Sequence, residues 1–182
     1  MRNKRRKLSA YDRKFAAENV FHNLVRTPQF RHSTRIAAYW SVAGELDPEP
    51  IRKEALVRKK EIFLPTLCKL RNRHMFFLPW KETAATNLGR YGIPEPRLVL
   101  SQITPLWTMD LVLLPLVAFD NSGNRVGMGG GYYDQALANM GGRRPLLIGL
   151  GYEFQRVDKI SVQPWDIPLD AIVTERRFQL IR

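Results

Sequence analysis

The stretch DLVLLPLVAFDNSGNRVGMGGGYYD, residues 110–134, decides the fold that we predict for this chain. Its first half, Leu111 to Phe119, is apolar apart from Pro115 and is bounded by aspartates, a pattern typical of a buried strand that ends in a turn. Its second half is rich in glycine, and the run from Tyr132 to Met140 then has helical spacing. Five of the 12 glycines of the chain lie here, at positions 123, 127, 129, 130 and 131. The stretch therefore predicts a strand, a glycine loop and a helix.

A glycine loop between a strand and a helix can bind phosphate. Without Cβ atoms the backbone can turn its N–H groups toward an anion, and the first turn of the helix adds partial positive charge. Arg125 could clamp phosphate oxygens and Asp134 could hold a bridging Mg2+. The Walker A motif and the dinucleotide fingerprint are both absent. These residues alone fit a nucleotide site and a close helix–sheet packing turn equally well.

The same stretch resembles the signature of the 5-formyltetrahydrofolate cyclo-ligase family. The family pattern Pro-Leu-x-Ala-Phe-Asp stands here as residues 115–120, and Gly-x-Arg-x-Gly-x-Gly-Gly-Gly-Tyr-Tyr-Asp as residues 123–134. The resemblance implies an ATP- and Mg2+-dependent ligase that converts 5-formyltetrahydrofolate to 5,10-methenyltetrahydrofolate, with Arg125 and Asp134 as catalytic residues. It implies ATP contacts at Arg125, Val126, Gly127, Met128, Gly129, Gly130, Gly131, Tyr132 and Tyr133, of which Met128 to Tyr132 also reach the folate.

The N-terminal part of the ATP site is open to two interpretations. In the family, a Lys and an Arg that contact the nucleotide lie upstream of the segment matched by Arg5, Arg6, Leu8 and Ser9. Either the true start of the chain lies upstream, or Lys4, Arg5 and Arg6 take their place. We assign Lys4 and Arg5 to the ATP site on this basis.

The folate side of the site is expected after the first strand, residues 36–40. Gly44-Glu45-Leu46-Asp47 matches a Gly-Glu loop of the family, and the resemblance places the folate against Glu45 and Trp40. A carboxylate can accept hydrogen bonds from adjacent pterin N–H groups, and an indole can cover a flat ring. Judged without the family, a solvated loop acid and a core tryptophan would be the more common roles.

The resemblance extends to the C-terminal part of the chain. Residues 165–170 match an Asp-containing family element, from which we carry over Asp166 as a second Mg2+ ligand beside Asp134. An Asp two residues before Pro168 would otherwise be interpreted as a turn cap. The segment 92–96, Gly-Ile-Pro-Glu-Pro, also matches and is expected to be a rigid loop that shapes the site.

Alternating strand and helix patterns predict one domain, residues 1–182, with a three-layer α/β/α, Rossmann-like fold and a largely parallel sheet. In such folds ligands bind at the carboxyl ends of the strands, where the Glu45 loop and the glycine loop both begin. The predicted helices are residues 10–26, 50–60 and 132–140, and the predicted strands are residues 36–40, 61–64, 75–78, 111–119 and 146–150.

The distribution of charge along the chain bears on the choice between possible functions. The net charge is +12, but residues 1–35 carry ten Lys and Arg against two Asp and Glu, so most of the excess is local. A basic N-terminal segment could bind nucleic acid, line the entrance for an anionic substrate or be a solvated helix face. We keep a nucleic-acid- or ribosome-associated protein as the alternative function, although the acidic residues of the site would then be unexplained. A paralogue with the same ATP-activated cyclisation chemistry but another substrate also stays open.

Cysteine and hydropathy content bear on the expected compartment and partners. The single cysteine, Cys68, lies in an apolar context and excludes an internal disulfide, and no apolar run is long enough to span a bilayer. We expect a cytoplasmic monomer that acts on small molecules, not on nucleic acid or membranes. The three histidines show no metal-ligand spacing, so Mg2+ on the two aspartates is the only metal expected.

Overall fold

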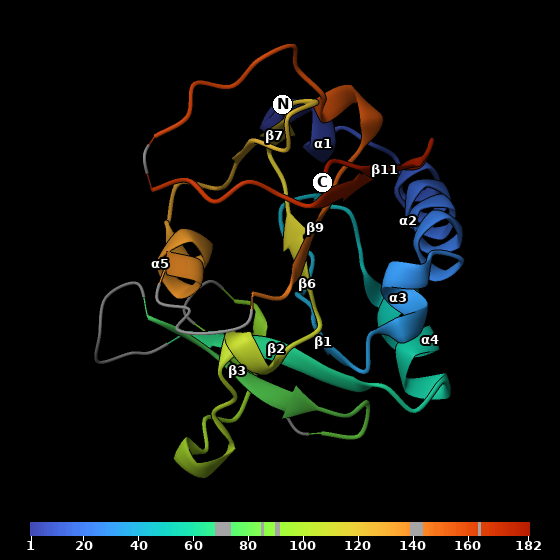
Figure 1. Ribbon diagram of the computed structural model, residues 1–182. Coiled ribbons are helices and arrows are strands. Elements are labelled where there is room, and N and C mark those ends of the chain that lie inside the picture. Colours follow the sequence, from blue (N-terminus) through green and yellow to red (C-terminus); the bar gives the residue numbers. More distant parts are fainter. Residues whose placement is uncertain (68–73, 85, 90–91, 139–143, 164) are drawn as a thin grey trace.

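A seven-stranded sheet forms the centre of the protein, with strand order β11-β10-β9-β6-β1-β2-β3 (Figure 1). The computed structural model describes residues 1–182 except 68–73, 85, 90–91, 139–143 and 164. The sheet strands are β1 (Arg35–Ala37), β2 (Glu61–Leu67), β3 (Met75–Trp80), β6 (Leu111–Pro115), β9 (Leu146–Leu150), β10 (Ala171–Val173) and β11 (Phe178–Leu180). The five strands from β10 to β2 run parallel, and the edge strands β3 and β11 run antiparallel. The prediction of a largely parallel sheet is confirmed.

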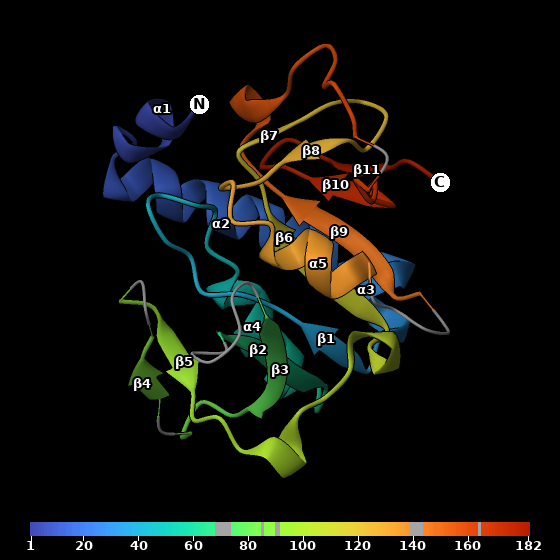
Figure 2. The same cartoon turned by 90° about the vertical axis from the view of Figure 1, so that its left-hand side faces the viewer.

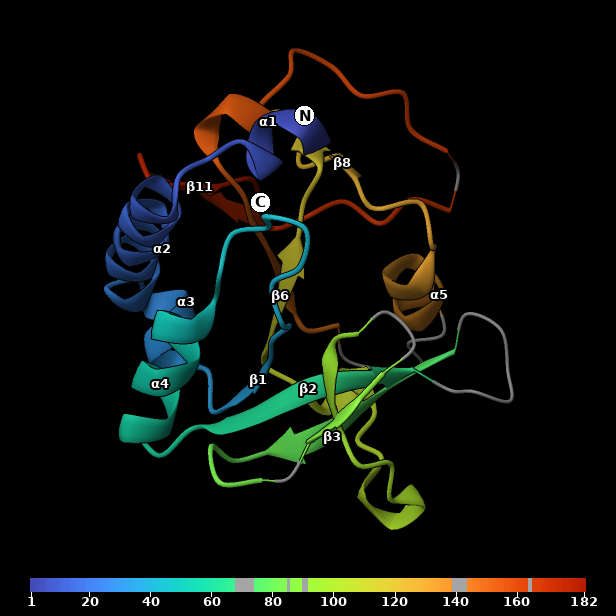
Figure 3. The same ribbon diagram turned by 180° about the vertical axis from the view of Figure 1, so that it is seen from behind.

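Helices cover both faces of this sheet (Figures 1 and 3). One face carries α2 (Ala10–Val25), α3 (Pro28–His32) and α4 (Glu49–Val57), and the other carries α5 (Tyr132–Ala138). The short α1 (Arg2–Arg6) lies near the carboxyl ends of the central strands. The predicted three-layer α/β/α arrangement is therefore confirmed, and the helix predicted at residues 10–26 matches α2. Residues 139 and 140 of the predicted last helix, and Cys68, lie outside the described residues.

Both faces of the central strands are buried, which explains the continuous apolar runs in the sequence. Along β6, Leu111 and Leu113 pack with α2 and α4, while Val112 and Leu114 pack in the second core beneath α5. All four side chains are 0% exposed. Successive strand residues point to opposite faces, so a strand between two helix layers needs apolar residues at every position.

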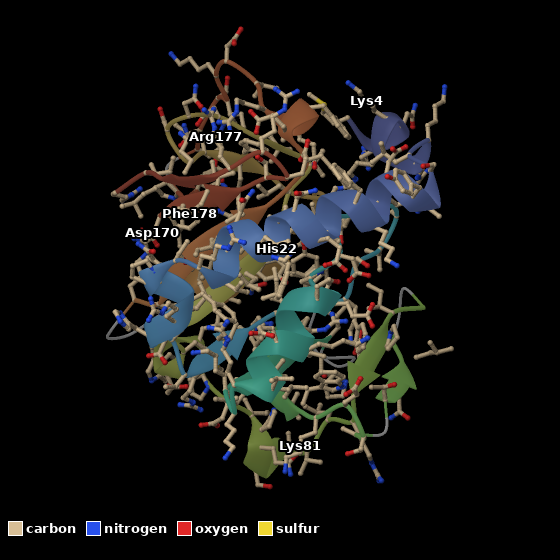
Figure 4. All side chains as sticks on the ribbon, turned by 90° about the vertical axis from the view of Figure 1, so that its right-hand side faces the viewer. Lys4, His22, Lys81, Asp170, Arg177 and Phe178 are labelled. Carbon is tan, nitrogen blue, oxygen red and sulfur yellow. The ribbon has the colours of Figure 1, made fainter. Side chains whose placement is uncertain are left out.

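The first turn of α2 is capped as its sequence suggests. Ser9 accepts a hydrogen bond from the backbone N–H of Asp12 at 3.0 Å. α2 lies across its side of the molecule and borders the β10–β11 hairpin, as His22, Arg177 and Phe178 show in Figure 4. The amide of Asn23 donates to the backbone carbonyl of Thr174 at 3.0 Å and fixes the helix to the sheet.

Several strand boundaries differ from the predictions. The apolar run 111–119 is not one strand, because β6 ends at Pro115 and the chain then turns into β7 (Ala118–Phe119), which pairs with β8 (Arg125–Val126) in a separate two-stranded sheet. Pro65 and Pro79 do not end their strands as predicted. Proline has no backbone N–H and so cannot donate a hydrogen bond to a neighbouring strand. Pro65 lies beyond the last β1–β2 pair, at Phe63, and Pro79 lies on the edge strand β3. Each position therefore has a neighbouring strand on one side only.

The remaining described elements are short. The segment 92–96, predicted as a rigid loop, contributes β5 (Pro94–Pro96), which pairs with β4 (Thr86–Leu88) outside the main sheet. Three 3-10 helices complete the described chain: η1 (Leu100–Gln102), η2 (Leu106–Thr108) and η3 (Glu153–Gln155). Among the described helices, none combines the length and the apolar character needed to cross a membrane.

Candidate active site

The candidate site lies where the strand order of the sheet reverses. β1 is followed along the chain by its neighbour β2 on one side, and β6 is followed by its neighbour β9 on the other side. The segments that leave the carboxyl ends of β1 and β6 therefore diverge around a common crevice, the usual ligand position in an open α/β sheet. These segments are residues 38–48, which we call the Glu45 loop, and residues 116–131, which end in the glycine loop, residues 127–131 (Figure 2).

The β7–β8 hairpin holds the start of the glycine loop in place. Its turn is organised by Asp120, which accepts hydrogen bonds from the backbone N–H groups of Ser122, Asn124 and Ile160 and from the side chain of Asn124. Burial works to raise the pKa of the Asp120 carboxyl, but these hydrogen bonds outweigh it and keep the pKa below the ordinary value. Asp120 is thus a charged structural anchor for the loop.

The glycine loop itself is open. A Cβ added at Gly127, Gly129 or Gly131 would meet no atom within 4 Å. Gly129 and Gly131 also have positive φ angles, +89° and +67°, which are unfavourable for residues with a side chain. At these three positions the loop therefore borders open space, and the phosphate contacts of the loop stay a prediction.

Arg125 and Asp134, the two predicted catalytic residues, are brought together by the fold. The Arg125 guanidinium forms an ion pair with the Asp134 carboxylate and also donates to the backbone carbonyl of Ile167. The side chain of Arg125 is 7% exposed and that of Asp134 is 39% exposed. A fixed cation and a partly accessible carboxylate thus lie side by side, on either side of the glycine loop in sequence.

Asp166 has the contacts of a turn residue. Its carboxylate accepts a hydrogen bond from the backbone N–H of Gln163 at 2.8 Å, and its own N–H donates to the Gln163 carbonyl at 3.0 Å. In the described part of the chain, no three His, Cys, Asp or Glu side chains gather closely enough to hold a metal ion. The shared Mg2+ shell of Asp134 and Asp166 stays a prediction.

Glu45 lies on a strained turn and is nearly buried. The preceding residues Ala43 and Gly44 have φ angles of 50° and 75°, and the Glu45 carboxylate accepts a hydrogen bond from the N–H of Val42 at 3.2 Å. Its exposed fraction is 6%. Burial raises the pKa of the Glu45 carboxyl, an effect that the Val42 hydrogen bond and the charge of Arg5 reduce. The sequence did not indicate this burial for an acidic loop residue.

Trp40 follows β1 and belongs to a cluster of aromatic rings around a buried cation. The Arg52 guanidinium lies over the Trp40 ring at 4.0 Å and near the Trp80 ring at 5.7 Å, and the two indoles meet edge to face at 5.6 Å. Nη1 of Arg52 donates to the carbonyl of Tyr39 at 2.5 Å. Arg52 covers one face of Trp40, so a flat ligand ring would have to use another part of the indole. The burial of Arg52 was not predicted; the only sequence feature that indicates it is the position of Arg52 beside the apolar residues Ile51 and Ala55 in a predicted helix.

The two tyrosines after the glycine loop have different roles. The ring of Tyr132 packs over Gly130, where an added Cβ would lie 2.8 Å from ring atom Cδ2. The Tyr133 hydroxyl is buried and has no hydrogen-bond partner among the described residues. Burial and the negative charge of Glu45 raise its pKa, while the positive charge of Arg125 lowers it. Tyr133 is therefore within electrostatic reach of both the Glu45 loop and the ion pair.

Lys4 and Arg5, the two N-terminal residues predicted to contact ATP, differ in their exposure to solvent. Lys4 is exposed at the α1 end of the molecule (Figure 4). Its ammonium lies over the Phe154 ring at 4.6 Å. Arg5 is 0% exposed, and its guanidinium is bonded to protein groups, including the carbonyl of Leu116 at 2.9 Å. That a member of a basic run should be fully buried could not be foreseen from sequence. Direct contact of either residue with ATP stays a prediction.

A cleft of about 880 Å3 opens beside the Glu45 loop. Its walls come from α2, the Glu45 loop and the start of α4, and include Arg13, Lys14, Glu45 and Lys53. The volume lies within the ~300–1,000 Å3 typical of small-molecule sites. An organic ligand of moderate size can thus reach Glu45 from the α2 side.

Comparison with known proteins agrees with this geometry. The model of the 5-formyltetrahydrofolate cyclo-ligase family matches residues 1–175. The chain belongs to this family. Two curated cyclo-ligases, from Haemophilus influenzae and Escherichia coli K12, are each 32% identical to it. The first alignment covers 93% of this chain and 90% of the relative, and the second covers 96% of both.

Solved structures of cyclo-ligase relatives have the same fold. The NMR structure of 5,10-methenyltetrahydrofolate synthetase from Aquifex aeolicus superposes with a TM-score of 0.84 at 32% identity, over 100% of this chain and 89% of that one. The synthetase from Mycoplasma pneumoniae, 24% identical, superposes with a TM-score of 0.73 over 96% of this chain and 93% of that one, and supports the fold. The family resemblance inferred from residues 115–134 is confirmed.

Proposed function

We propose that this cyclo-ligase family member converts 5-formyltetrahydrofolate to 5,10-methenyltetrahydrofolate, with ATP consumed and ADP and phosphate released. The observation that carries the proposal is the meeting of the Glu45 loop and the glycine loop at adjacent strands, β1 and β6. A reaction between a folate and a nucleotide needs two such half-sites within reach of one another. Both halves come from one chain, so a monomer is sufficient for activity.

The glycine loop is the ATP half-site in this proposal. Its open backbone at Gly127, Gly129 and Gly131 allows phosphate oxygens to approach N–H groups. Arg125 adds a fixed guanidinium, and Lys4 adds an exposed ammonium from α1. Arginine and backbone donors are well suited to the spread charge of a transferring phosphoryl group.

The Glu45 loop is the folate half-site. The Glu45 carboxylate lies beside the cleft between α2 and α4 and can accept pterin N–H groups. Since burial already raises its pKa, hydrogen bonds from a ligand would relieve part of the cost of keeping it charged. Trp40 comes from the same loop and supplies apolar surface, held in place by Arg52.

The chemistry follows from the substrate. A formamide carbon is a poor electrophile and its oxygen a poor leaving group. Transfer of the γ-phosphoryl group to the formyl oxygen breaks the P–O bond to ADP and forms a phosphate ester, in which the formyl oxygen is part of a good leaving group. The folate N10 then attacks the formyl carbon and loses its proton, and phosphate leaves with the electron pair of the C–O bond. The protein positions the groups and stabilises charge, without a protein nucleophile.

Mg2+ would enter with the nucleotide. Asp134 suits this role because its carboxylate is partly exposed beside the loop, and Asp166 would be the second protein ligand. Two carboxylates are too few to complete the coordination shell of Mg2+, so phosphate and water oxygens would supply the remaining ligands. When bound, the ion would neutralise phosphate charge and orient the γ-phosphoryl group.

Labelling of the formyl oxygen tests this chemistry. With 18O in the formyl group, the proposal predicts that the label ends in inorganic phosphate, which mass spectrometry of the released phosphate can measure. Methenyl product with label found in water, and none in phosphate, would contradict transfer to the formyl oxygen.

A further inference from the structure

We infer that Arg5 is a positioning residue that links the Glu45 loop to the glycine loop and thereby makes the affinities for folate and ATP depend on one another. The inference rests on the proposed assignment of these loops to the two substrates. It gives Arg5 a different role from the direct ATP contact predicted from sequence.

The guanidinium of Arg5 reaches three separate segments. Nη1 donates to the carbonyl of Leu116, directly after β6, at 2.9 Å. Nη2 donates to the carbonyl of Ala43 in the Glu45 loop at 3.4 Å and lies 3.6 Å from the sulfur of Met128 in the glycine loop. A planar guanidinium with several donors can serve such acceptors together, whereas a lysine ammonium on a flexible stem cannot reproduce the fork.

The backbone of α1 contacts the Glu45 loop as well. Gly44 has a φ of +75°, and a Cβ built on it would lie 2.9 Å from the carbonyl oxygen of Arg5. In Figure 3 the chain that leaves β1 rises toward α1, in agreement with this contact. The Glu45 loop is thus anchored at its start by β1 and at Ala43 and Gly44 by Arg5.

The electrostatic surroundings of Arg5 are unusual for a buried cation. Its side chain is 0% exposed, and within the described ranges no carboxylate forms an ion pair with it. The positive charge of Arg5 acts on Glu45 and reduces the rise that burial causes in the pKa of that carboxyl. A buried charge that relies on carbonyl acceptors depends strongly on their positions. A shift of either loop therefore changes the environment of the same guanidinium.

Coupling between the substrates follows. If ATP orders the glycine loop around Met128, the Arg5 fork is held in place, and the Glu45 loop is then presented to folate at lower entropic cost. By linkage, folate must favour ATP by the same factor. Couplings of this kind typically change affinity by about 5- to 150-fold.

Calorimetry with the full chain and Mg2+ can measure this coupling. Binding of 5-formyltetrahydrofolate would be titrated with and without a non-hydrolysable ATP analogue. We expect the analogue to tighten folate binding of the wild type by about tenfold, and of Arg5→Met by less than about twofold. Arg5→Lys keeps the charge but not the fork, and is expected to behave like Arg5→Met.

Two further variants separate the link from general damage. Met128→Leu removes only the sulfur acceptor at an exposed residue, and should reduce the coupling even if Arg5→Met does not fold. Arg2→Met removes the same charge from an exposed position of α1 and should leave the coupling at the wild-type value. Full coupling in Arg5→Lys and Met128→Leu would overturn the inference. So would a wild type that binds both ligands independently, whereas failure to bind either ligand would instead contradict the proposed function.

Discussion

The guanidinium of Arg125 and the carboxylate of Asp134 form an ion pair across the glycine loop. Arg125 is almost enclosed and is also tied to the carbonyl of Ile167, whereas Asp134 is 39% exposed at the start of α5. The pair therefore has one fixed member and one accessible member. In the proposed function, Asp134 is the member that the cation of an incoming nucleotide would engage.

Asp134→Ala is expected to abolish turnover without unfolding the protein. The variant loses the carboxylate proposed to hold Mg2+, but Asp134 itself is 39% exposed and Arg125 keeps the Ile167 carbonyl as an acceptor, so the protein should stay folded. We expect kcat to fall by at least about 100-fold, and thermal unfolding to stay close to that of the wild type. Asp158→Ala, at an exposed loop position, is the control. A wild-type rate in Asp134→Ala would remove this residue from the metal site.

Gly127→Ala and Gly130→Val are expected to weaken ATP binding for different reasons. A Cβ at position 127 enters open space, so any loss of affinity must come from crowding the nucleotide. A side chain at position 130 also displaces the Tyr132 ring, so we expect a lower melting temperature there as well. Calorimetry with ATP and thermal melts distinguish the two effects. Unchanged ATP affinity in both variants would show that the loop does not bind phosphate.

Glu45→Gln is expected to weaken folate binding more than ATP binding. Glutamine keeps the shape of the side chain and an acceptor for the Val42 N–H, but loses the charge that would pair with pterin donors. A charge-assisted hydrogen bond is worth ~1.5–3 kcal/mol, so KM for folate should rise by roughly tenfold or more. Steady-state kinetics with each substrate varied in turn would measure this. A larger effect on ATP than on folate would place Glu45 outside the folate pocket.

The same substitution predicts a pH-dependent gain in stability. Burial raises the pKa of the Glu45 carboxyl above its ordinary value, so the folded state binds this proton more tightly than the unfolded state. Stability then falls as pH rises from the unfolded pKa through the folded pKa, and the full cost is present above both. Glu45→Gln should therefore raise the melting temperature more at pH 7 than at pH 4, compared with wild type at each pH. An equal change at the two pH values would contradict a raised pKa.

Gln155 is expected to contribute strongly to stability. It is 1% exposed, donates to the carbonyls of Leu116 and Val117 at 2.6 and 2.9 Å, and accepts from the N–H of Tyr152 at 2.8 Å. Gln155→Leu would leave buried backbone groups without these partners, so we expect a loss of about 3 kcal/mol in the free energy of unfolding. Urea denaturation measures it, with the exposed Gln102→Leu as control. A loss below about 1 kcal/mol would mean that water or other groups replace these bonds.

The parts of the fold that depend on local pattern were predictable from the sequence. The Ser9 cap and the helical spacing after it specify α2, and a continuous apolar run specifies β9 because both faces of the strand are buried. The break of the 111–119 run was not predictable in this way. The apolar pattern resumes after Pro115, and what ends β6 is the pairing of β7 with β8, which depends on residues further along the chain.

The site was predictable in its composition and less so in its contacts. The glycine pattern and the resemblance selected the loop, Arg125 and Asp134, but the direct ion pair depends on how α5 returns to the hairpin. Arg5 and Arg52 are charged residues whose burial is possible only because carbonyls and aromatic rings from distant segments meet them. Such tertiary contacts leave no local signal in the sequence.

Formation of the methenyl product tests the central claim most directly. Purified protein would be mixed with ATP, Mg2+ and 5-formyltetrahydrofolate, and the near-ultraviolet absorbance of 5,10-methenyltetrahydrofolate followed, with ATP omitted as control and Asp134→Ala in parallel. We predict product that depends on ATP and is absent in the variant. A folded protein that binds ATP and 5-formyltetrahydrofolate but forms no methenyl product would contradict the proposed function.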